Sequence, residues 1–224
     1  AMLGFLVGKI LGRSKEVVAA FVIIATFGNV GNFGLQLILF RFGEVSRIPS
    51  TVYFLAILFI SFVICVGAAS WATSGGMQAV FSVFKTPALL ALIPAMALNL
   101  SDVEVPIFLS RLSGLLGQAM IPVMLVTLGV QMSEIVKISI NFNVIAASTV
   151  RLIGAPILAL LLAPQFDLEG IERSTGILQA AMPSAVLASI IAIEYKLVPE
   201  FVTTTVLFST LYSIITLTVL LTFI

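Results

Sequence analysis

The chain has 224 residues, of which 60% are hydrophobic and 9% are charged, and its formal net charge is +1. A water-soluble domain has about a quarter of its residues charged, so the composition excludes a soluble fold and predicts lipid as the main solvent. The small net charge and the scattered Lys and Arg residues exclude a nucleic-acid surface, and a single Cys without any His excludes disulfides and the usual zinc sites.

Apolar segments bounded by charged or turn residues follow one another near 1–12, 16–40, 50–73, 86–100, 106–132, 140–164, 174–193 and 199–224. Because about 20 apolar residues span the hydrocarbon core, they predict an all-α integral membrane protein with about eight transmembrane segments. The first and fourth of these segments are short for a full crossing. The connection 74–85 is expected in the cytoplasm and offers room for a short interfacial helix.

Lysines and arginines are distributed unequally over the alternate connections. One set of connections holds three of them, and the other holds six, which are Lys9, Arg13, Lys15, Lys85, Lys137 and Lys196. Positive residues are enriched on the cytoplasmic side of membrane proteins. The larger set is therefore predicted to be cytoplasmic, which places both ends of this chain on the outer side of the cell (inner) membrane.

Helix-weakening and polar residues interrupt the segment 16–40 near its middle. Five of them lie within seven residues: Gly28, Asn29, Gly31, Asn32 and Gly34. Glycine loosens a helix, and an asparagine amide both donates and accepts hydrogen bonds. We interpret this stretch as a break in the helix that forms a polar site. The alternative is that the glycines let a neighbouring helix approach and the asparagines bond across that interface.

The segment 174–193 has a comparable interruption at Pro183 and Ser184. Proline has no N–H, so Pro183 frees the carbonyl of Gln179 and leaves a half-helix that begins near Ser184. The free N–H groups and positive dipole end of such a half-helix hold anions, while freed carbonyls upstream face a cation or water. The alternative is an ordinary proline kink, which membrane helices tolerate.

The two interrupted segments occupy equivalent places in a repeated layout. The first three apolar segments match the last three in pattern, with faint identity. The interrupted segments lie an odd number of segments apart, so they cross the membrane in opposite directions, as in inverted-repeat transporters. We therefore divide the chain into the last part of one repeat (1–73), the connection 74–85 and a second five-helix repeat (86–224). Two further helices are expected before Ala1.

Two more polar side chains lie within apolar segments. Arg151 carries a charge that is costly to bury in hydrocarbon without a partner. It is a candidate counter-charge for a substrate, and the alternative is that it snorkels or pairs with carbonyl groups. Gln118 lies four residues before Pro122, which frees the Gln118 carbonyl, and both are candidates for lining a pathway.

Three stretches carry a resemblance to a known family: GNVGNFGL at 28–35, GQAMIP at 117–122 with LG at 128–129, and AMPSA at 181–185 with EY at 194–195. Over nearly its whole length the chain resembles the auxin efflux carrier family, whose bacterial members move malonate, malate and related carboxylates. The resemblance implies ten helices in two inverted five-helix repeats. The fourth and ninth helices of such a protein are broken and cross where the substrate carboxylate binds, and the first two contribute to a dimer.

On this match, segment 16–40 is the fourth helix and segment 174–193 is the ninth. Asn29 falls on the family's substrate-contacting asparagine, and Pro183 and Ser184 fall on the second break. Gly28 and Gln36 depart from the pattern, which often has prolines there. Ser184 also departs from it, since plant members have a polar amide at that position.

Together these inferences predict a secondary transporter of small organic anions, carboxylates such as malonate, malate or auxin-like acids, that works by alternating access. No nucleophile–base pair or metal set points to an enzyme. The expected partners are the organic anion, the bilayer and a second copy of the chain, with no cofactor apart from a possible sodium ion. The predicted substrate-binding residues are Asn29, Gly31, Asn32, Gln118, Arg151, Gln179, Pro183 and Ser184.

Two alternatives remain open at the level of sequence. One is a sodium-coupled organic-anion symporter of the bile-acid type, in which freed carbonyls and the asparagine side chains hold sodium. The other is a non-transporting membrane sensor or a shortened assembly module, which predicts ligand binding or dimerisation without flux.

Overall fold

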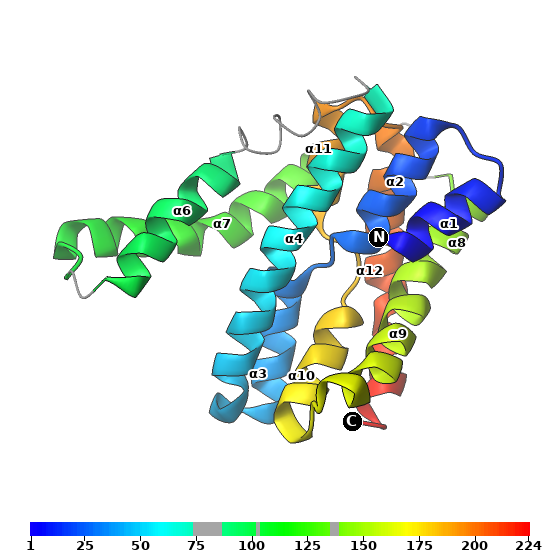
Figure 1. Ribbon diagram of the computed structural model, residues 1–224. Helices are drawn as coiled ribbons and strands as arrows, with labels where there is room; N and C mark the ends of the chain where they lie inside the picture. Colours follow the sequence, from blue (N-terminus) through cyan, green and yellow to red (C-terminus); the bar gives the residue numbers. More distant parts are fainter. Residues whose placement is uncertain (74–86, 102–103, 135–138) are drawn as a thin grey trace.

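The computed structural model describes residues 1–73, 87–101, 104–134 and 139–224. Within these residues the chain is almost entirely helical (Figure 1). The α-helices are α1 (Met2–Ile10), α2 (Lys15–Thr26), α3 (Gln36–Phe42), α4 (Arg47–Thr73), α6 (Pro87–Leu100), α7 (Ile107–Glu134), α8 (Phe142–Thr149), α9 (Ala155–Leu162), α10 (Gly170–Ala180), α11 (Val186–Glu194) and α12 (Pro199–Leu221). The predicted connection 74–85, with its possible interfacial helix, lies outside the described residues.

Among the described residues, three helical stretches are long and apolar enough to cross a membrane: Glu44–Thr73, Phe142–Phe166 and Pro199–Leu221, with mean hydropathies of 2.6, 2.0 and 1.8. They correspond to the predicted segments 50–73, 140–164 and 199–224. The second stretch joins α8 to α9 through a π-helical turn, Val150–Gly154. The prediction of an all-α membrane protein is therefore confirmed at this level.

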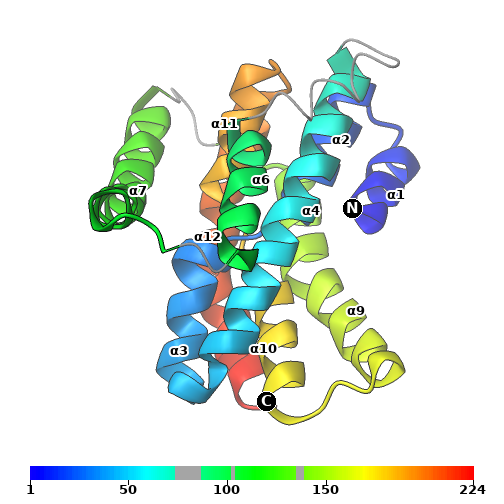
Figure 2. The same cartoon turned by 60° about the vertical axis from the view of Figure 1, so that its left-hand side comes forward.

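Two other helical segments are interrupted at the predicted places. After α2 the chain leaves helical conformation at 27–29, passes through a π-helical segment, Val30–Leu35, and continues as α3. After α10 it is unwound at 181–185 before α11 begins. The two composite helices run in opposite directions, and their unwound parts meet in the middle of the bundle (Figures 1 and 2).

The core is built around α2, which packs against α1 and α4. Every residue from Val18 to Ala25 is buried, as expected for a helix that is apolar on all sides. Gly4 of α1 allows a close approach, because a Cβ there would lie 2.5 Å from the carbonyl oxygen of Phe21. Cys65 of α4 is a buried free thiol whose Sγ lies 3.9 Å from the carbonyl oxygen of Ile23. This firm packing fixes the position of the first break.

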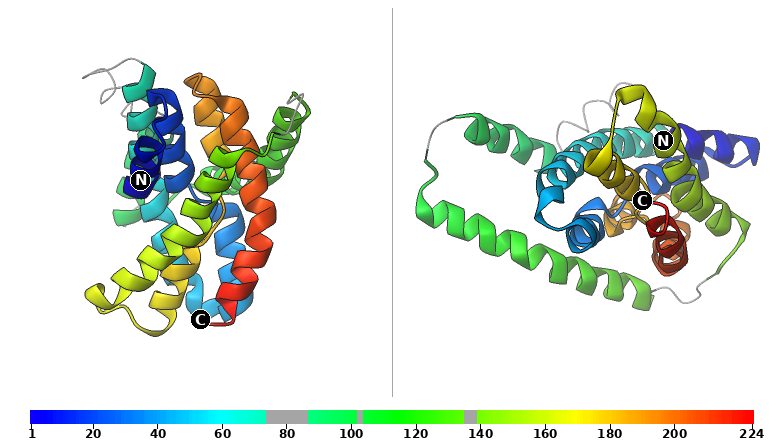
Figure 3. Two further views of the ribbon diagram at one scale, coloured as in Figure 1. Left: turned by 90° about the vertical axis from the view of Figure 1, so that its right-hand side faces the viewer. Right: turned by 90° about the horizontal axis from the view of Figure 1, so that it is seen from below.

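Helices α6 and α7 extend away from the helices that surround the two breaks (Figures 1 and 3). Many of their described side chains are apolar and exposed, among them Leu98, Phe108, Leu115 and Val126. Such a surface suits a lipid environment, in agreement with the composition. Helix α7 continues through Pro122 without a break.

Candidate functional site

The unwound parts of the two interrupted helices are joined by backbone hydrogen bonds. Gly28 and Ser184 form an isolated antiparallel bridge. The Asn29 N–H donates to the Pro183 carbonyl at 2.7 Å, and the Ala185 N–H donates to the Phe27 carbonyl at 2.8 Å. These bonds satisfy backbone groups that would otherwise be unpaired at membrane depth. We call this junction of residues 27–29 and 183–185 the crossing.

One side of the crossing gathers the carboxyl-terminal ends of α2 and α10. Arg151, on the π-helical turn between α8 and α9, is only 5% exposed and reaches both ends. Its Nε donates to the Met182 carbonyl at 2.7 Å, and its Nη1 donates to the Ala25 carbonyl at 3.0 Å. A helix carries partial negative charge at this end, so a buried guanidinium is stabilised there. Of the two interpretations of Arg151, the structure therefore favours pairing with carbonyl groups.

The other side of the crossing holds a cavity of about 270 Å³ beside the amino-terminal end of α11. Its polar side chains are Asn29 and Asn32; the complete lining is Phe27, Gly28, Asn29, Val30, Gly31, Asn32, Phe54, Leu58, Phe62, Ala185, Val186 and Leu187. A helix carries partial positive charge at its amino-terminal end. The crossing thus separates negative helix ends, at Arg151, from a positive helix end, at the cavity.

The cavity is mostly apolar, and its candidate donors belong to the start of α11 and to Asn29. Val186 and Leu187 are the first two residues of α11, where N–H groups have no acceptor within the helix, and both line the cavity. The Ala185 and Ala188 N–H groups are already bonded, to Phe27 and Ala185 carbonyls respectively. The side-chain amide of Asn29, unlike its backbone N–H, has no hydrogen bond among the described residues. These groups suit the binding of a carboxylate.

Aromatic and aliphatic side chains of α4 form the remaining wall. Phe54, Leu58 and Phe62 are spaced four residues apart and therefore lie on one face of α4. The Phe62 ring packs edge-on against Phe27, with centroids 5.1 Å apart. Sequence reasoning did not identify these residues. Their regular spacing was visible, but in a wholly apolar helix it does not separate a cavity wall from a lipid-facing surface.

Gly31 sets how closely this wall approaches. A Cβ at Gly31 would lie only 2.7 Å from Cε2 of Phe54. The absence of a side chain at this position therefore lets the Phe54 ring reach the π-helical segment. Among the predicted site residues, Asn29, Gly31 and Asn32 line the cavity together.

Ser184 and Pro183 are fully buried in the crossing and do not line the cavity. The Ser184 hydroxyl donates to the Ile24 carbonyl at 3.2 Å, and the Ser184 N–H donates to Oγ of Ser209, also at 3.2 Å. These two predicted residues thus hold the crossing together. Gln118 is exposed on α7, which extends away from the crossing, and the structure does not bring it to the other predicted residues.

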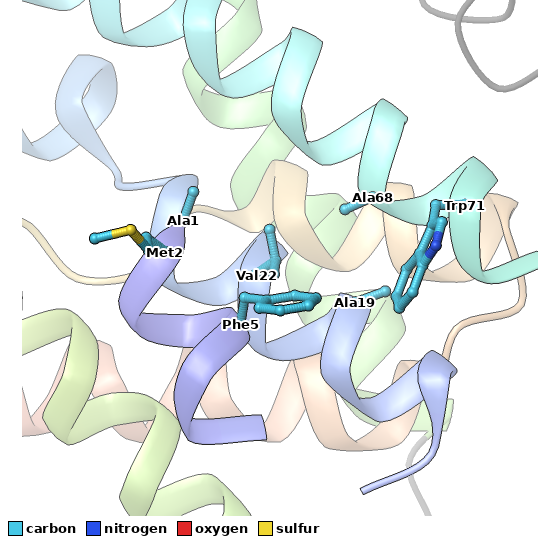
Figure 4. A pocket seen from close by; sticks show the side chains of 7 residues that line it. All are labelled: Ala1, Met2, Phe5, Ala19, Val22, Ala68 and Trp71. Carbon is cyan, nitrogen blue, oxygen red and sulfur yellow. The ribbon is translucent and has the colours of Figure 1, made fainter. Parts of the chain in front are cut away.

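Gln179 and Arg151 line a second hollow of about 310 Å³, which shares no residue with the first. The Gln179 side chain is fully buried, and its Nε2 donates to the Ser50 carbonyl at 3.4 Å. A third hollow, of about 440 Å³, is lined by apolar residues of α1, α2 and α4, including Phe5 and Trp71 (Figure 4). The indole nitrogen of Trp71 is the single polar side-chain atom among the residues that line it. The hollow at Arg151 lies at the negative carboxyl-terminal ends of α2 and α10, whereas the cavity beside α11 lies at a positive amino-terminal end, and we take the latter as the candidate anion site.

A helical bundle with two interrupted, crossing helices and a cavity beside their breaks defines a class of membrane transport proteins. The family model described as "Membrane transport protein" matches residues 76–221, which is more than half of the chain. The chain therefore belongs to this family, the auxin efflux carrier family, as its resemblance indicated. It is a family of membrane transporters and not of enzymes.

Two archaeal proteins are similar to the chain. An uncharacterized transporter of Methanocaldococcus jannaschii is 22% identical over 220 residues, which are 96% of this chain and 71% of that protein. An uncharacterized transporter of Methanothermobacter thermautotrophicus is 30% identical over 105 residues, which are 46% of this chain and 34% of that protein. Both similarities agree with a membrane transport protein.

Proposed function

We propose that the protein is a secondary transporter of small organic anions, carboxylates such as malonate, malate or auxin-like acids, bound at the crossing. The observation that carries this proposal is the cavity of about 270 Å³ at the amino-terminal end of α11, beside the amide of Asn29. An anion in this cavity meets the positive end of a helix, whereas the negative helix ends point to the other side.

The lining supports a definite mode of binding. The carboxylate accepts hydrogen bonds from the N–H groups of Val186 and Leu187 and from the Asn29 amide, which replace part of its hydration shell. The apolar part of the anion packs against Phe54, Leu58 and Phe62. A cavity with few polar groups and an apolar wall is typical of sites for small molecules.

The same arrangement supports alternating access. The two interrupted helices run in opposite directions and are bonded to each other at their breaks, so we expect their breaks to move together when access alternates. The division into inverted repeats at 1–73 and 86–224, the homodimer and the outer location of both chain ends stay predictions.

Uptake into proteoliposomes tests the function. Labelled malonate, malate and indole-acetate are offered to purified protein in liposomes, with and without an imposed membrane potential, and protein-free liposomes are the control. Saturable uptake of at least one carboxylate is the expected result. Specific binding without any flux would instead favour a membrane sensor or an assembly module.

A further inference from the structure

The carbonyl oxygens at the end of α2 all have hydrogen-bond donors. Each of its last four carbonyls accepts a hydrogen bond: Ile23 from the Phe27 N–H (2.9 Å), Ile24 from the Ser184 hydroxyl (3.2 Å), Ala25 from the Arg151 guanidinium (3.0 Å) and Thr26 from the Ser61 hydroxyl (3.2 Å). Carbonyls freed at the ends of interrupted helices are the groups that coordinate a coupling cation in many carriers. At α2 these oxygens already have donors.

Two carbonyls of the unwound segment that follows α10 also accept hydrogen bonds. The Met182 carbonyl accepts a hydrogen bond from Arg151, and the Pro183 carbonyl accepts one from the Asn29 N–H. Arg151 therefore bonds to both broken helices at once, from a third element of the chain.

The charge of the guanidinium matches its surroundings. In the described part of the chain the one ion pair joins Arg47 to Glu44, so Arg151 has no carboxylate partner there. Two helix ends that each carry roughly half a negative charge offset about one positive charge. The helix ends and their carbonyls thus serve as the counter-charge of Arg151.

The guanidinium of Arg151 also fills the space beside Gly28. A Cβ built on Gly28 would overlap the Arg151 guanidinium, so the guanidinium lies directly against the backbone of the crossing. Gly28, which contacts the guanidinium, also lines the cavity on the other side of the crossing. The positive charge is therefore separated from the proposed substrate by one backbone segment.

We propose that Arg151 is a tethered cation, whose guanidinium occupies the carbonyl site that a coupling sodium ion would need. The protein then transports its anion without sodium. This inference rests on the proposed function for the identity of the anion, but the occupied carbonyl site is independent of the substrate. Arg151 acts as a positioning residue, because it holds the two broken helices in the geometry that forms the cavity. Lysine is not equivalent here, since its single ammonium cannot reproduce a planar fork that bonds two carbonyls.

Thermal unfolding in detergent tests the occupied site without reference to a substrate. Wild type, Arg151→Ala and Arg151→Lys are compared in sodium, in choline and in choline with added millimolar methylguanidinium. The exposed Arg111→Ala of α7 is the matched control. We expect the midpoint of wild type to be the same in sodium and choline, and that of Arg151→Ala to fall by about 10 °C. Methylguanidinium should raise the midpoint of Arg151→Ala but not that of Arg111→Ala.

The sodium requirement is then tested by uptake of whichever carboxylate the liposome assay identifies. Replacing sodium by choline should leave the initial rate of wild type unchanged. The proposal would be overturned if the unfolding midpoint or the uptake rate of wild type fell when choline replaced sodium. It would also be overturned if methylguanidinium raised the midpoint of Arg151→Ala no more than that of Arg111→Ala. If Arg151→Ala does not fold, Arg151→Lys takes its place, with a lowered midpoint expected. Absence of uptake, with the expected midpoints, would reject the transport function and leave the tethered cation standing.

Discussion

The guanidinium of Arg151 and the backbone of Gly28 are in direct contact, with no room for a Cβ between them. This contact joins the span Phe142–Phe166 to the first break and, through the Met182 carbonyl, to the second. The family pattern often has a proline at the position that Gly28, the smallest residue, occupies in this chain. The glycine is explained by the bulk of the guanidinium that lies against it.

Gly28→Ala should destabilise the protein strongly. The added methyl group displaces the guanidinium and leaves a buried charge without its carbonyl partners, at a cost of about 3–5 kcal/mol. Gly67→Ala is the matched control, because a Cβ there meets nothing within 4 Å and alanine favours the helix α4. Thermal unfolding of both variants in detergent checks the prediction. Equal midpoints for the two variants would show that the contact contributes little.

Asn29→Ala should weaken carboxylate binding without unfolding the protein. Loss of a hydrogen bond to an ionised group amounts to about 1.5–3 kcal/mol, which corresponds to about tenfold to hundredfold in affinity. Asn99→Ala, at an exposed position of α6, is the control and should bind as wild type does. Titration of the purified proteins with the transported carboxylate measures the effect. Unchanged affinity in Asn29→Ala would remove this amide from the site.

Gly31→Ala should reduce binding by closing the cavity. Its new Cβ would lie 2.7 Å from the Phe54 ring, which then has to move, and the cavity is the adjoining free space. In the double variant Gly31→Ala with Phe54→Leu, the smaller side chain should restore part of the affinity. A double-mutant cycle measures this coupling. Additive effects of the two substitutions would mean that residues 31 and 54 do not share the cavity wall.

Ser184→Ala should act on stability and leave substrate binding nearly unchanged. The hydroxyl is fully buried and bonds to the Ile24 carbonyl, so its removal leaves that carbonyl without this donor and lowers stability by about 1 kcal/mol. The measurement compares the unfolding midpoint with the KM for uptake. A raised KM with an unchanged midpoint would instead restore Ser184 to the role predicted from the sequence, contact with the substrate.

Both breaks were predictable because their causes are local. Glycine and asparagine clusters and a proline weaken a helix wherever it lies, so the sequence located the interruptions at 27–29 and 181–185 to within a few residues. The role of Arg151 was left between two interpretations. Its hydrogen-bond partners, Ala25 and Met182, lie 126 and 31 residues away in the chain, and local pattern does not reveal such partners.

The cavity wall and the roles of Ser184 and Gln118 depend on packing between helices. Phe54, Leu58 and Phe62 belong to a helix in which nearly every residue is apolar, so hydrophobic pattern gives no facing direction. Ser184 follows the proline of the second break, but only the approach of α2 turns its hydroxyl toward Ile24. Gln118 lies on a helix that extends away from the crossing, and the chain order of segments does not predict that placement.

Substrate protection of an introduced cysteine tests the central claim most directly. Cys65 is the single cysteine of the chain and is buried, so Cys65→Ala provides a background without thiols. Leu187→Cys then reports on the cavity beside α11, and Ala68→Cys reports on the apolar hollow of Figure 4. The rate of labelling by a small thiol reagent is measured with and without malonate, malate and indole-acetate. The account predicts that at least one of them slows labelling of Leu187→Cys and leaves Ala68→Cys unaffected. Equal rates at Leu187→Cys with and without every carboxylate would contradict it.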